Sequence, residues 1–127
     1  MTKILLVEDD IYISHVFERA FKNAGYEMEI KIDAESAWDA LNTATTLPAV
    51  ILLDLTLPKM SGAELLGKIR ADKRFEHTPV AVLTNAFTEG IEKELLSAGA
   101  NMYLVKVDYA PMELVNKVEE LMRNFTL

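Results

Sequence analysis

The sequence predicts an α/β fold in which a parallel five-stranded sheet is covered by helices on both faces. Short apolar stretches alternate with stretches of helical periodicity five times along the chain, as in repeated strand–helix units. Three of the apolar stretches contain no polar residue, which is typical of parallel strands buried on both faces. No linker, low-complexity segment or repeat interrupts this alternation, so we expect one domain over residues 1–127.

The composition narrows the class of protein. The chain is 50% hydrophobic and 26% charged, as in ordinary globular proteins. It contains no cysteine, which excludes disulfides and thiolate metal sites and suits a cytoplasmic protein. The net charge of −7 argues against nucleic acid as a direct partner. No apolar run approaches the ~20 residues that span a bilayer, so we expect no membrane association.

The first half of the chain is predicted to form two strand–helix units and a third strand, over residues 3–7, 11–24, 26–32, 34–45 and 50–54. The first strand leads directly into an acidic stretch, and the helix after it has Asp10 as its N-cap and Gly25 as its stop signal. The second strand alternates apolar and polar residues, which is typical of a half-exposed edge. Asp33 is a suitable N-cap for the second helix, and the third strand is apolar up to Asp54.

The second half continues the pattern over residues 63–71, 79–83, 89–98, 102–105 and from 111 onward. The fourth strand is apolar and ends at Thr84, and the fifth ends at Lys106. Gly99 is a stop signal for the fourth helix, and Pro111 suits the first position of the last one. The basic run Lys68, Arg70, Lys73 and Arg74 is interpreted as a solvated face of the domain.

The character of the strands also predicts their order. The apolar first, third and fourth strands belong in the centre of the sheet and the alternating second strand at an edge, which favours the order 2-1-3-4-5. This order places the topological switch point between the first and third strands. Because ligands of open α/β sheets bind at the carboxyl ends of the strands beside that point, we expect the functional site between Glu8 or Asp9 and Asp54.

The strand ends predicted to meet there carry a distinctive set of groups: Glu8, Asp9, Asp54, Thr84 and Lys106. Three crowded carboxylates repel one another unless a cation lies among them, and oxygen ligands favour Mg²⁺, with Mn²⁺ as the alternative. A carboxylate at such a strand end serves as a nucleophile, a metal ligand or a cap. Asp54 could also act as a nucleophile that attacks phosphorus. In that case a metal ion would neutralise one phosphoryl oxygen, the Lys106 ammonium would neutralise a second, and the Thr84 hydroxyl would donate a hydrogen bond to a third.

Four motifs carry a resemblance to a known family: Leu6-Val-Glu-Asp-Asp10, Leu53-Asp-Leu-Thr-Leu-Pro-Lys-Met-Ser-Gly62, Leu83-Thr84 and Tyr103-Leu-Val-Lys106. In this order and spacing the whole chain resembles the receiver domain of two-component response regulators, in particular the chemotaxis regulators. The resemblance implies a flavodoxin-like (βα)5 three-layer sandwich. It also implies a phosphorelay function, in which a histidine kinase or a histidine phosphotransfer protein phosphorylates an aspartate.

The resemblance assigns roles to individual residues. Asp54 matches the phospho-acceptor, and Lys106 matches the phosphate-binding lysine. Glu8 and Asp9 match the acidic metal-binding pair, with Asp9 as the more direct ligand, and the backbone carbonyl of Thr56 matches the third metal ligand. Thr84 matches the switch hydroxyl, and Tyr103 matches the aromatic switch. The signalling surface of the family is formed by the fourth helix, the fifth strand and the fifth helix. A homodimer through the same surface is also compatible with the resemblance.

Three features depart from the family pattern. Val107 follows Lys106 where a cis proline is usual, and because a cis bond before a non-proline residue costs ~2.5–4 kcal/mol, we predict a trans bond and a reshaped loop. Asn85 replaces a small residue and is expected either to narrow access to the phosphoryl site or to form a hydrogen bond near it. Thr56 and Ala86 carry no carboxylate or amide that could orient an attacking water, which favours a long-lived phosphoryl group.

We favour a binding domain that is controlled by phosphorylation and is not an enzyme. Two other functions were compared with it. A small phosphatase acting through an aspartyl phosphate would need a second carboxylate just after its nucleophile, and this chain has Leu55 and Thr56 there. A flavin-binding domain would need a loop rich in Ser, Thr and Gly after the first strand, where this chain is acidic. We rank the phosphatase second and the flavin-binding domain last.

Overall fold

The structure, a computed structural model, describes residues 1–125 and contains one parallel sheet of order β2-β1-β3-β4-β5. The strands are β1 (Lys3–Val7), β2 (Glu27–Lys31), β3 (Val50–Asp54), β4 (Val80–Thr84) and β5 (Met102–Val105). The helices are α1 (Ile11–Asn23), α2 (Ala34–Thr43), α3 (Gly62–Ala71), α4 (Ile91–Ser97) and α5 (Pro111–Asn124), with short 3₁₀ turns η1 (Lys73–Phe75) and η2 (Lys106–Asp108). The predicted fold class and strand order are confirmed.

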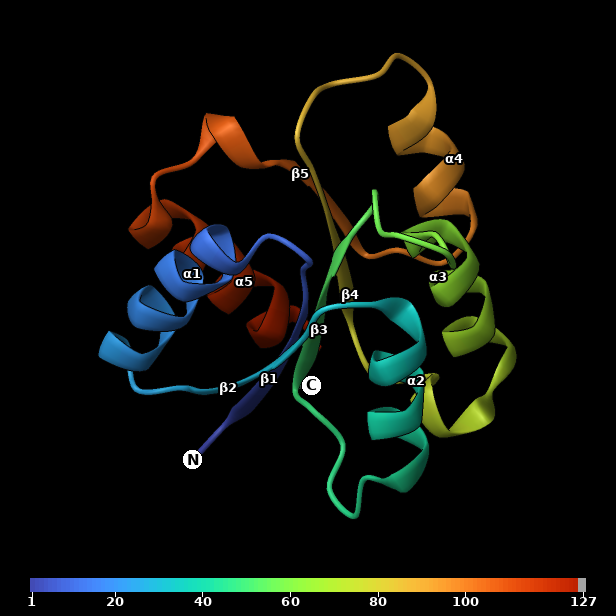
Figure 1. Ribbon diagram of the computed structural model, residues 1–127, viewed down its shortest axis with the longest axis horizontal. Coiled ribbons are helices and arrows are strands. Elements are labelled where there is room, and N and C mark those ends of the chain that lie inside the picture. Colours follow the sequence, from blue (N-terminus) through green and yellow to red (C-terminus); the bar gives the residue numbers. More distant parts are fainter. Residues whose placement is uncertain (126–127) are drawn as a thin grey trace.

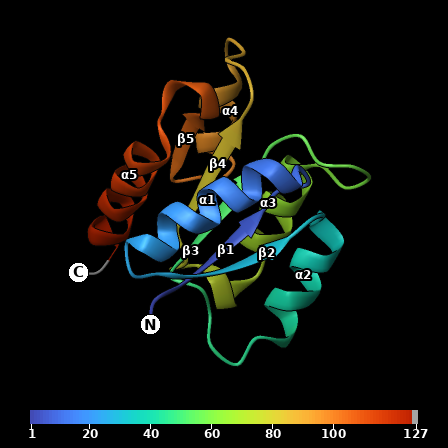
Figure 2. The same ribbon diagram turned by 60° about the vertical axis from the view of Figure 1, so that its left-hand side comes forward.

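Helices cover the sheet on both faces (Figures 1 and 2). α1 and α5 lie on one face, and α2, α3 and α4 lie on the other. Every residue of β3 and β4 is buried, because these central strands have helices above and below them. The core on the α1 and α5 side includes Phe21 and Val118, and the core on the opposite side includes Leu66 and Phe75. Among the described residues, no helix combines the length and apolar character needed to cross a membrane.

The two edges of the sheet differ in character. β2 forms one edge and carries charges at Glu27, Glu29 and Lys31. Glu29 forms ion pairs with Lys3 on the neighbouring strand, at 3.0 Å, and with Lys31, at 3.6 Å. β5 forms the other edge, and all four of its residues are uncharged.

The helix ends follow the predicted signals. Asp10 and Asp33 each accept a hydrogen bond from a backbone N–H three residues on, at 3.1 and 2.7 Å. Gly25 and Gly99 have φ values of +97° and +111°, which favour glycine. α4 is shorter than the predicted 89–98, because Gly90 stands before it with φ of +84° and no side chain caps its start.

The interpretation of the basic run as a solvated face is wrong for Arg70. Its half-buried guanidinium donates four hydrogen bonds, of 2.8 to 2.9 Å, to oxygen atoms of Phe75, Thr78, Gly99 and Asn101. Arg74 is exposed, but its guanidinium lies 5.0 Å from the centre of the Phe75 ring. The interpretation as a solvated face therefore does not hold for the whole basic run, because Arg70 and Arg74 both make contacts within the fold.

Candidate functional site

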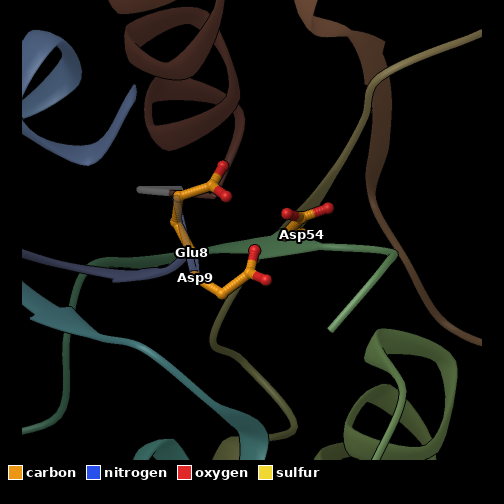
Figure 3. Close-up of side chains that lie close together, drawn as sticks. All are labelled: Glu8, Asp9 and Asp54. Atoms are coloured by element: carbon orange, nitrogen blue, oxygen red, sulfur yellow. The ribbon is translucent and has the colours of Figure 1, made fainter. Parts of the chain in front are cut away.

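Three carboxylates converge at the carboxyl ends of β1 and β3 (Figure 3). The parallel register pairs Val7 with Leu53, so the residues that follow, Glu8 and Asp54, lie side by side. One carboxylate oxygen from each of Glu8, Asp9 and Asp54 lies within 4.8 Å of the other two. Glu8 and Asp54 are only 1% and 2% exposed, whereas Asp9 is exposed. The predicted acidic site is therefore assembled as the strand order required.

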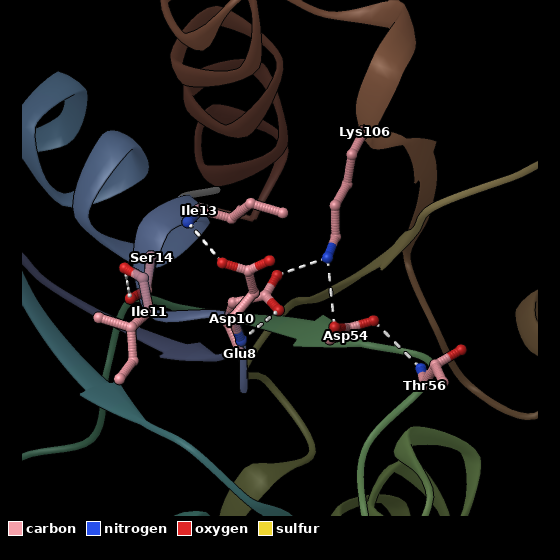
Figure 4. Close-up of polar contacts among 8 residues, drawn as sticks. All are labelled: Glu8, Asp10, Ile11, Ile13, Ser14, Asp54, Thr56 and Lys106. Carbon is pink, nitrogen blue, oxygen red and sulfur yellow. Dashed lines mark hydrogen bonds and ion pairs between the residues drawn. The ribbon is translucent and has the colours of Figure 1, made fainter.

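Lys106 brings a positive charge into this cluster from the start of η2 (Figure 4). Its Nζ lies 2.5 Å from Oε1 of Glu8 and 3.2 Å from Oδ2 of Asp54. The lysine is itself only 9% exposed, so the ion pairs form in a region that is poorly screened by water. The ammonium group thus offsets part of the negative charge.

The environment of the site shifts the pKa of the Glu8 carboxyl. Its pKa is raised from 4.5 to about 7, chiefly because burial disfavours the charged form. The neighbouring Asp54 raises the pKa further, and the hydrogen bond from Lys106 opposes both effects. Burial and Asp54 therefore favour the protonated form of Glu8, whereas the contact with Lys106 favours its carboxylate.

The backbone around Asp54 is held on both sides. The N–H of Leu55 donates to the carbonyl of Leu83 on β4, and the N–H of Gly62 donates back to the carbonyl of Leu55, at 2.8 and 3.1 Å. A Cβ on Gly62 would lie only 2.2 Å from the backbone oxygen of Asp54, so only glycine allows this close approach. The N–H of Thr56 donates to Oδ1 of Asp54 at 3.1 Å, which orients the carboxylate (Figure 4). The loop after β3 thus fixes the position of Asp54.

Two predicted switch residues do not contact the carboxylates in this structure. Thr84 ends β4 and is buried, but its hydroxyl donates to the carbonyl of Ala86, at 3.2 Å, in its own loop. Tyr103 on β5 is partly buried and packs against the core beneath α3 and α4. Its hydroxyl is buried and has no hydrogen-bond partner within residues 1–125. The Tyr103 hydroxyl is therefore available to form a hydrogen bond, whereas that of Thr84 would have to give up its bond to Ala86 before donating elsewhere.

The groups described above surround an open pocket of about 330 Å³. Its lining comprises Glu8, Asp9, Asp10, Ile13, Asp54, Thr56, Asn85 and Lys106. Asn85 therefore stands at the pocket, as predicted. The sequence did not predict that Ile13 lines the pocket, because its place in the apolar pattern of the first helix indicated only core packing. It also missed that the N–H of Asp10 donates to Oε2 of Glu8 at 3.2 Å, a bond that spacing along the chain alone does not reveal.

The prediction of a trans bond after Lys106 is confirmed, since no peptide bond in the described part of the chain is cis. Val107 is 80% exposed and lies within η2. Lys106 nevertheless reaches Glu8 and Asp54, so the replacement of proline by valine does not prevent the lysine from entering the site.

Comparison with known proteins agrees with the fold. Residues 4–119 match the family model of the response regulator receiver domain. The chain is 33% identical over 121 residues to chemotaxis protein CheY1 of Helicobacter pylori, covering 92% of this chain and 94% of the relative. Among solved structures it is similar to a phosphorylated cyanobacterial phytochrome response regulator, RcpA, with a TM-score of 0.86, 28% identity and coverage of 99% and 96%. It is also similar to the Mn²⁺-bound form of response regulator Rcp1, with a TM-score of 0.79, 28% identity and coverage of 98% and 89%.

Receiver domains interact with histidine kinases or phosphotransfer proteins, bind Mg²⁺ through acidic residues and are in general not classical enzymes. The strand order, the acidic cluster with its lysine and the family match all agree. The chain belongs to the response regulator receiver domain family and is a phospho-accepting domain of two-component signalling.

Proposed function

We propose that Asp54 is the residue that accepts the phosphoryl group from a histidine kinase or a histidine phosphotransfer protein. The observation that carries this proposal is the contact between Lys106 and the buried carboxylates of Asp54 and Glu8. A buried carboxylate held by one lysine and faced by two further acids is costly to build. Such an arrangement suits phosphoryl transfer, which requires positioning and charge neutralisation more than covalent chemistry.

In the transfer, an oxygen of Asp54 forms a bond to phosphorus while the N–P bond of phosphohistidine breaks. The imidazole nitrogen of the donor keeps the electron pair and takes up a proton from water. Lys106 is close enough to Asp54 to neutralise one phosphoryl oxygen once it leaves Glu8. Thr84 would donate its hydroxyl to a second oxygen by giving up its bond to Ala86. The product is an acyl phosphate, which water hydrolyses.

The acidic cluster suits a hard divalent cation. All of its donors are oxygen atoms, and its three carboxylates lie close enough together to share one ion. Asp9 and Asp54, together with the backbone carbonyl of Thr56, would hold Mg²⁺, or Mn²⁺ in its place, with Glu8 beside them. The exposed Asp9 is the acid of the pair that is free of Lys106. When bound, the ion supplies positive charge to a phosphoryl oxygen.

The response to phosphorylation would pass through Thr84 and Tyr103 to the surface of α4, β5 and α5. The buried, unpaired hydroxyl of Tyr103 supports this route, because the side chain gains a hydrogen bond if it turns toward a new partner. A target protein, or a second copy of the chain forming a homodimer, would bind the altered surface. We propose that the protein performs this function in the cytoplasm and that the receiver domain covers residues 1–127. The domain would promote its own phosphorylation and dephosphorylation without turning over a separate substrate.

Intact-mass measurement tests the proposal. Incubation with acetyl phosphate and Mg²⁺ is expected to add one phosphoryl group to the wild-type chain and none to Asp54→Asn. Asp108→Asn, which alters an exposed acid outside the pocket, is the matched control and should be phosphorylated like the wild type. No adduct on the wild type, or an adduct that survives in Asp54→Asn, would refute the proposal.

A further inference from the structure

Arg70 joins four segments that are separate in the sequence. Starting from the last turn of α3, its Nη1 donates to the carbonyl of Phe75 in η1, at 2.8 Å, and its Nη2 to that of Thr78 just before β4, at 2.9 Å. Nε donates to the carbonyl of Gly99, and Nη2 also to Oδ1 of Asn101, both at 2.8 Å. All four acceptors are uncharged, so the guanidinium forms no ion pair with them. Its rigid, planar set of N–H donors instead fixes the relative positions of the segments that it contacts.

The turn after α4 is fitted closely to this side chain. Gly99 has φ of +111°, and a Cβ there would lie 2.5 Å from Cγ of Arg70. Asn101 secures the turn further, because its Oδ1 accepts from the N–H of Val80 and its N–H donates to the carbonyl of Val80, both at 2.8 Å. The carboxyl end of α4 is therefore tied to α3 and to the start of β4.

The amino end of α4 has no comparable support. Residues 85–90 are all exposed, and Gly90 precedes the helix without a side-chain cap. In Figure 1 the segment between β4 and α4 arches away from the sheet before the helix begins. Within α4 only Leu95 is buried, and Ile91 is partly buried. The helix is thus fixed firmly at one end and held by few apolar contacts at the other.

We propose that Arg70 is the pivot of α4. The carboxyl end of the helix stays fixed by the contacts of Arg70 with Gly99 and Asn101, while its amino end swings with residues 85–90. Movement of Thr84 toward the phosphoryl site would drive this swing, and in that respect the inference rests on the proposed function. Because the carboxyl end of α4 is held, a small displacement at Thr84 would rotate the whole helix about that end. Without this anchor, α4 would slide or fray instead.

Amide hydrogen exchange measured by NMR tests the pivot without any phosphorylation. Wild type is compared with Arg70→Met and with Arg74→Met, a control that removes the same charge from a nearby arginine without contacts to α4. In Arg70→Met, exchange at Gly99, Ala100 and Asn101 is expected to accelerate at least about tenfold more than exchange in β3, which reports global opening. Arg74→Met is expected to leave this ratio unchanged. Equal acceleration in β3 and at residues 99–101 would overturn the proposal.

Arg70→Lys serves as a second variant if Arg70→Met fails to fold. Its ammonium lacks the planar fork and cannot reproduce all four bonds, so the same relative acceleration is expected. Wild-type exchange at residues 99–101 in Arg70→Lys would overturn the proposal, because a simple positive charge would then suffice.

Chemical-shift changes on adding beryllofluoride and Mg²⁺ test the swing itself. In wild type, the changes are expected to be largest over residues 85–94 and smallest at 99–101, and Arg70→Met is expected to spread them across both ends. Changes in wild type that are as large at 99–101 as at 85–94 would overturn the pivot. If beryllofluoride changes no shift at Asp54, Thr84 or Lys106, the proposed function fails, and hydrogen exchange alone decides whether Arg70 anchors α4.

Discussion

Nζ of Lys106 lies 3.2 Å from Oδ2 of Asp54, although the two residues are 52 positions apart in the sequence. The contact depends on β1, β3 and β5 ending at the same edge of the sheet, since Lys106 follows β5 directly and also contacts Glu8. It places the one buried ammonium of the pocket beside the predicted phospho-acceptor.

Replacement of Lys106 by methionine is expected to slow phosphorylation of Asp54 by acetyl phosphate about 100-fold, because one oxygen of the transferred group loses its preorganised charge partner. Phosphate-affinity gels measure the rate, and urea unfolding verifies that the variant is folded. Lys117→Met, which alters a lysine on α5 outside the pocket, is the control. A rate for Lys106→Met within threefold of wild type would contradict the assigned role.

Binding of Mg²⁺ is expected to tighten about tenfold between pH 6 and pH 8, because Glu8, with a pKa of about 7, must lose its proton as the cation enters. Isothermal titration at the two pH values measures this change. Glu8→Gln has no proton to lose, and its affinity is expected to change less than about twofold over the same range. Equal affinities of the wild type at pH 6 and pH 8 would contradict the prediction.

The same pKa shift predicts how stability without metal depends on pH. The folded chain holds the Glu8 proton more tightly than the unfolded chain, whose pKa is near 4.5. The contribution of Glu8 is therefore fully present below pH 4.5 and is lost as the pH rises through about 7. In EDTA, the urea midpoint of the wild type should decline over this range relative to that of Glu8→Gln.

Two glycines of α3 offer a matched pair of substitutions. Gly62→Ala is expected to destabilise the fold by about 1–3 kcal/mol, because its Cβ would overlap the backbone oxygen of Asp54. Gly67→Ala has no heavy atom within 4 Å of the added Cβ and is expected to stabilise the helix by up to about 1 kcal/mol. Urea unfolding measures both, and equal effects of the two substitutions would show that the close approach at Gly62 does not matter.

The phosphoryl group on Asp54 is expected to persist for minutes or longer, because the exposed Thr56 and Ala86 offer no carboxylate or amide to orient water. Thr56→Asn introduces an amide and is expected to shorten the half-life at least about threefold, whereas Thr56→Val should leave it nearly unchanged. The decay is followed by intact mass after removal of acetyl phosphate. Loss from the wild type within seconds would refute the expectation.

The hydroxyl of Tyr26 donates to the Glu119 carboxylate at 2.6 Å and so joins the chain just before β2 to α5. Tyr26→Phe is expected to lower the free energy of unfolding by about 1 kcal/mol. Tyr12, which is 78% exposed, provides the control, and Tyr12→Phe should change stability by less than about 0.5 kcal/mol. Burial and Glu119 raise the pKa of Tyr26 to about 12, so this contribution is present below pH 10 and fades above it.

Much of the fold was predictable because local patterns reported it directly. Apolar strands became central and the alternating strand became an edge, as the burial of β3 and the half-exposure of β2 show. Asp10 and Asp33 capped helices because their short side chains reach N–H groups three residues on. Glu8, Asp54 and Lys106 met because parallel strands bring their carboxyl ends to one edge.

The features that could not be predicted from the sequence depend on contacts between distant segments or on local backbone geometry. Arg70 belongs to a charged run, and nothing local indicates that carbonyl groups of three other segments accept its hydrogen bonds. The hydroxyl of Thr84 was expected to face the phosphoryl site, but it donates to the carbonyl of Ala86 in its own loop. α4 begins at Ile91 because Gly90 adopts a left-handed conformation that composition does not reveal.

The contrast between the two edges of the sheet bears on how copies of the chain behave when crowded. An open strand edge can recruit a strand from another molecule and begin aggregation, and charged residues along the edge oppose this. β2 is guarded in this way by Glu27, Glu29 and Lys31, whereas β5 presents no charge. Growth of the sheet from copy to copy is therefore opposed at the β2 edge, and β5 is the edge with no charged residue to oppose strand pairing.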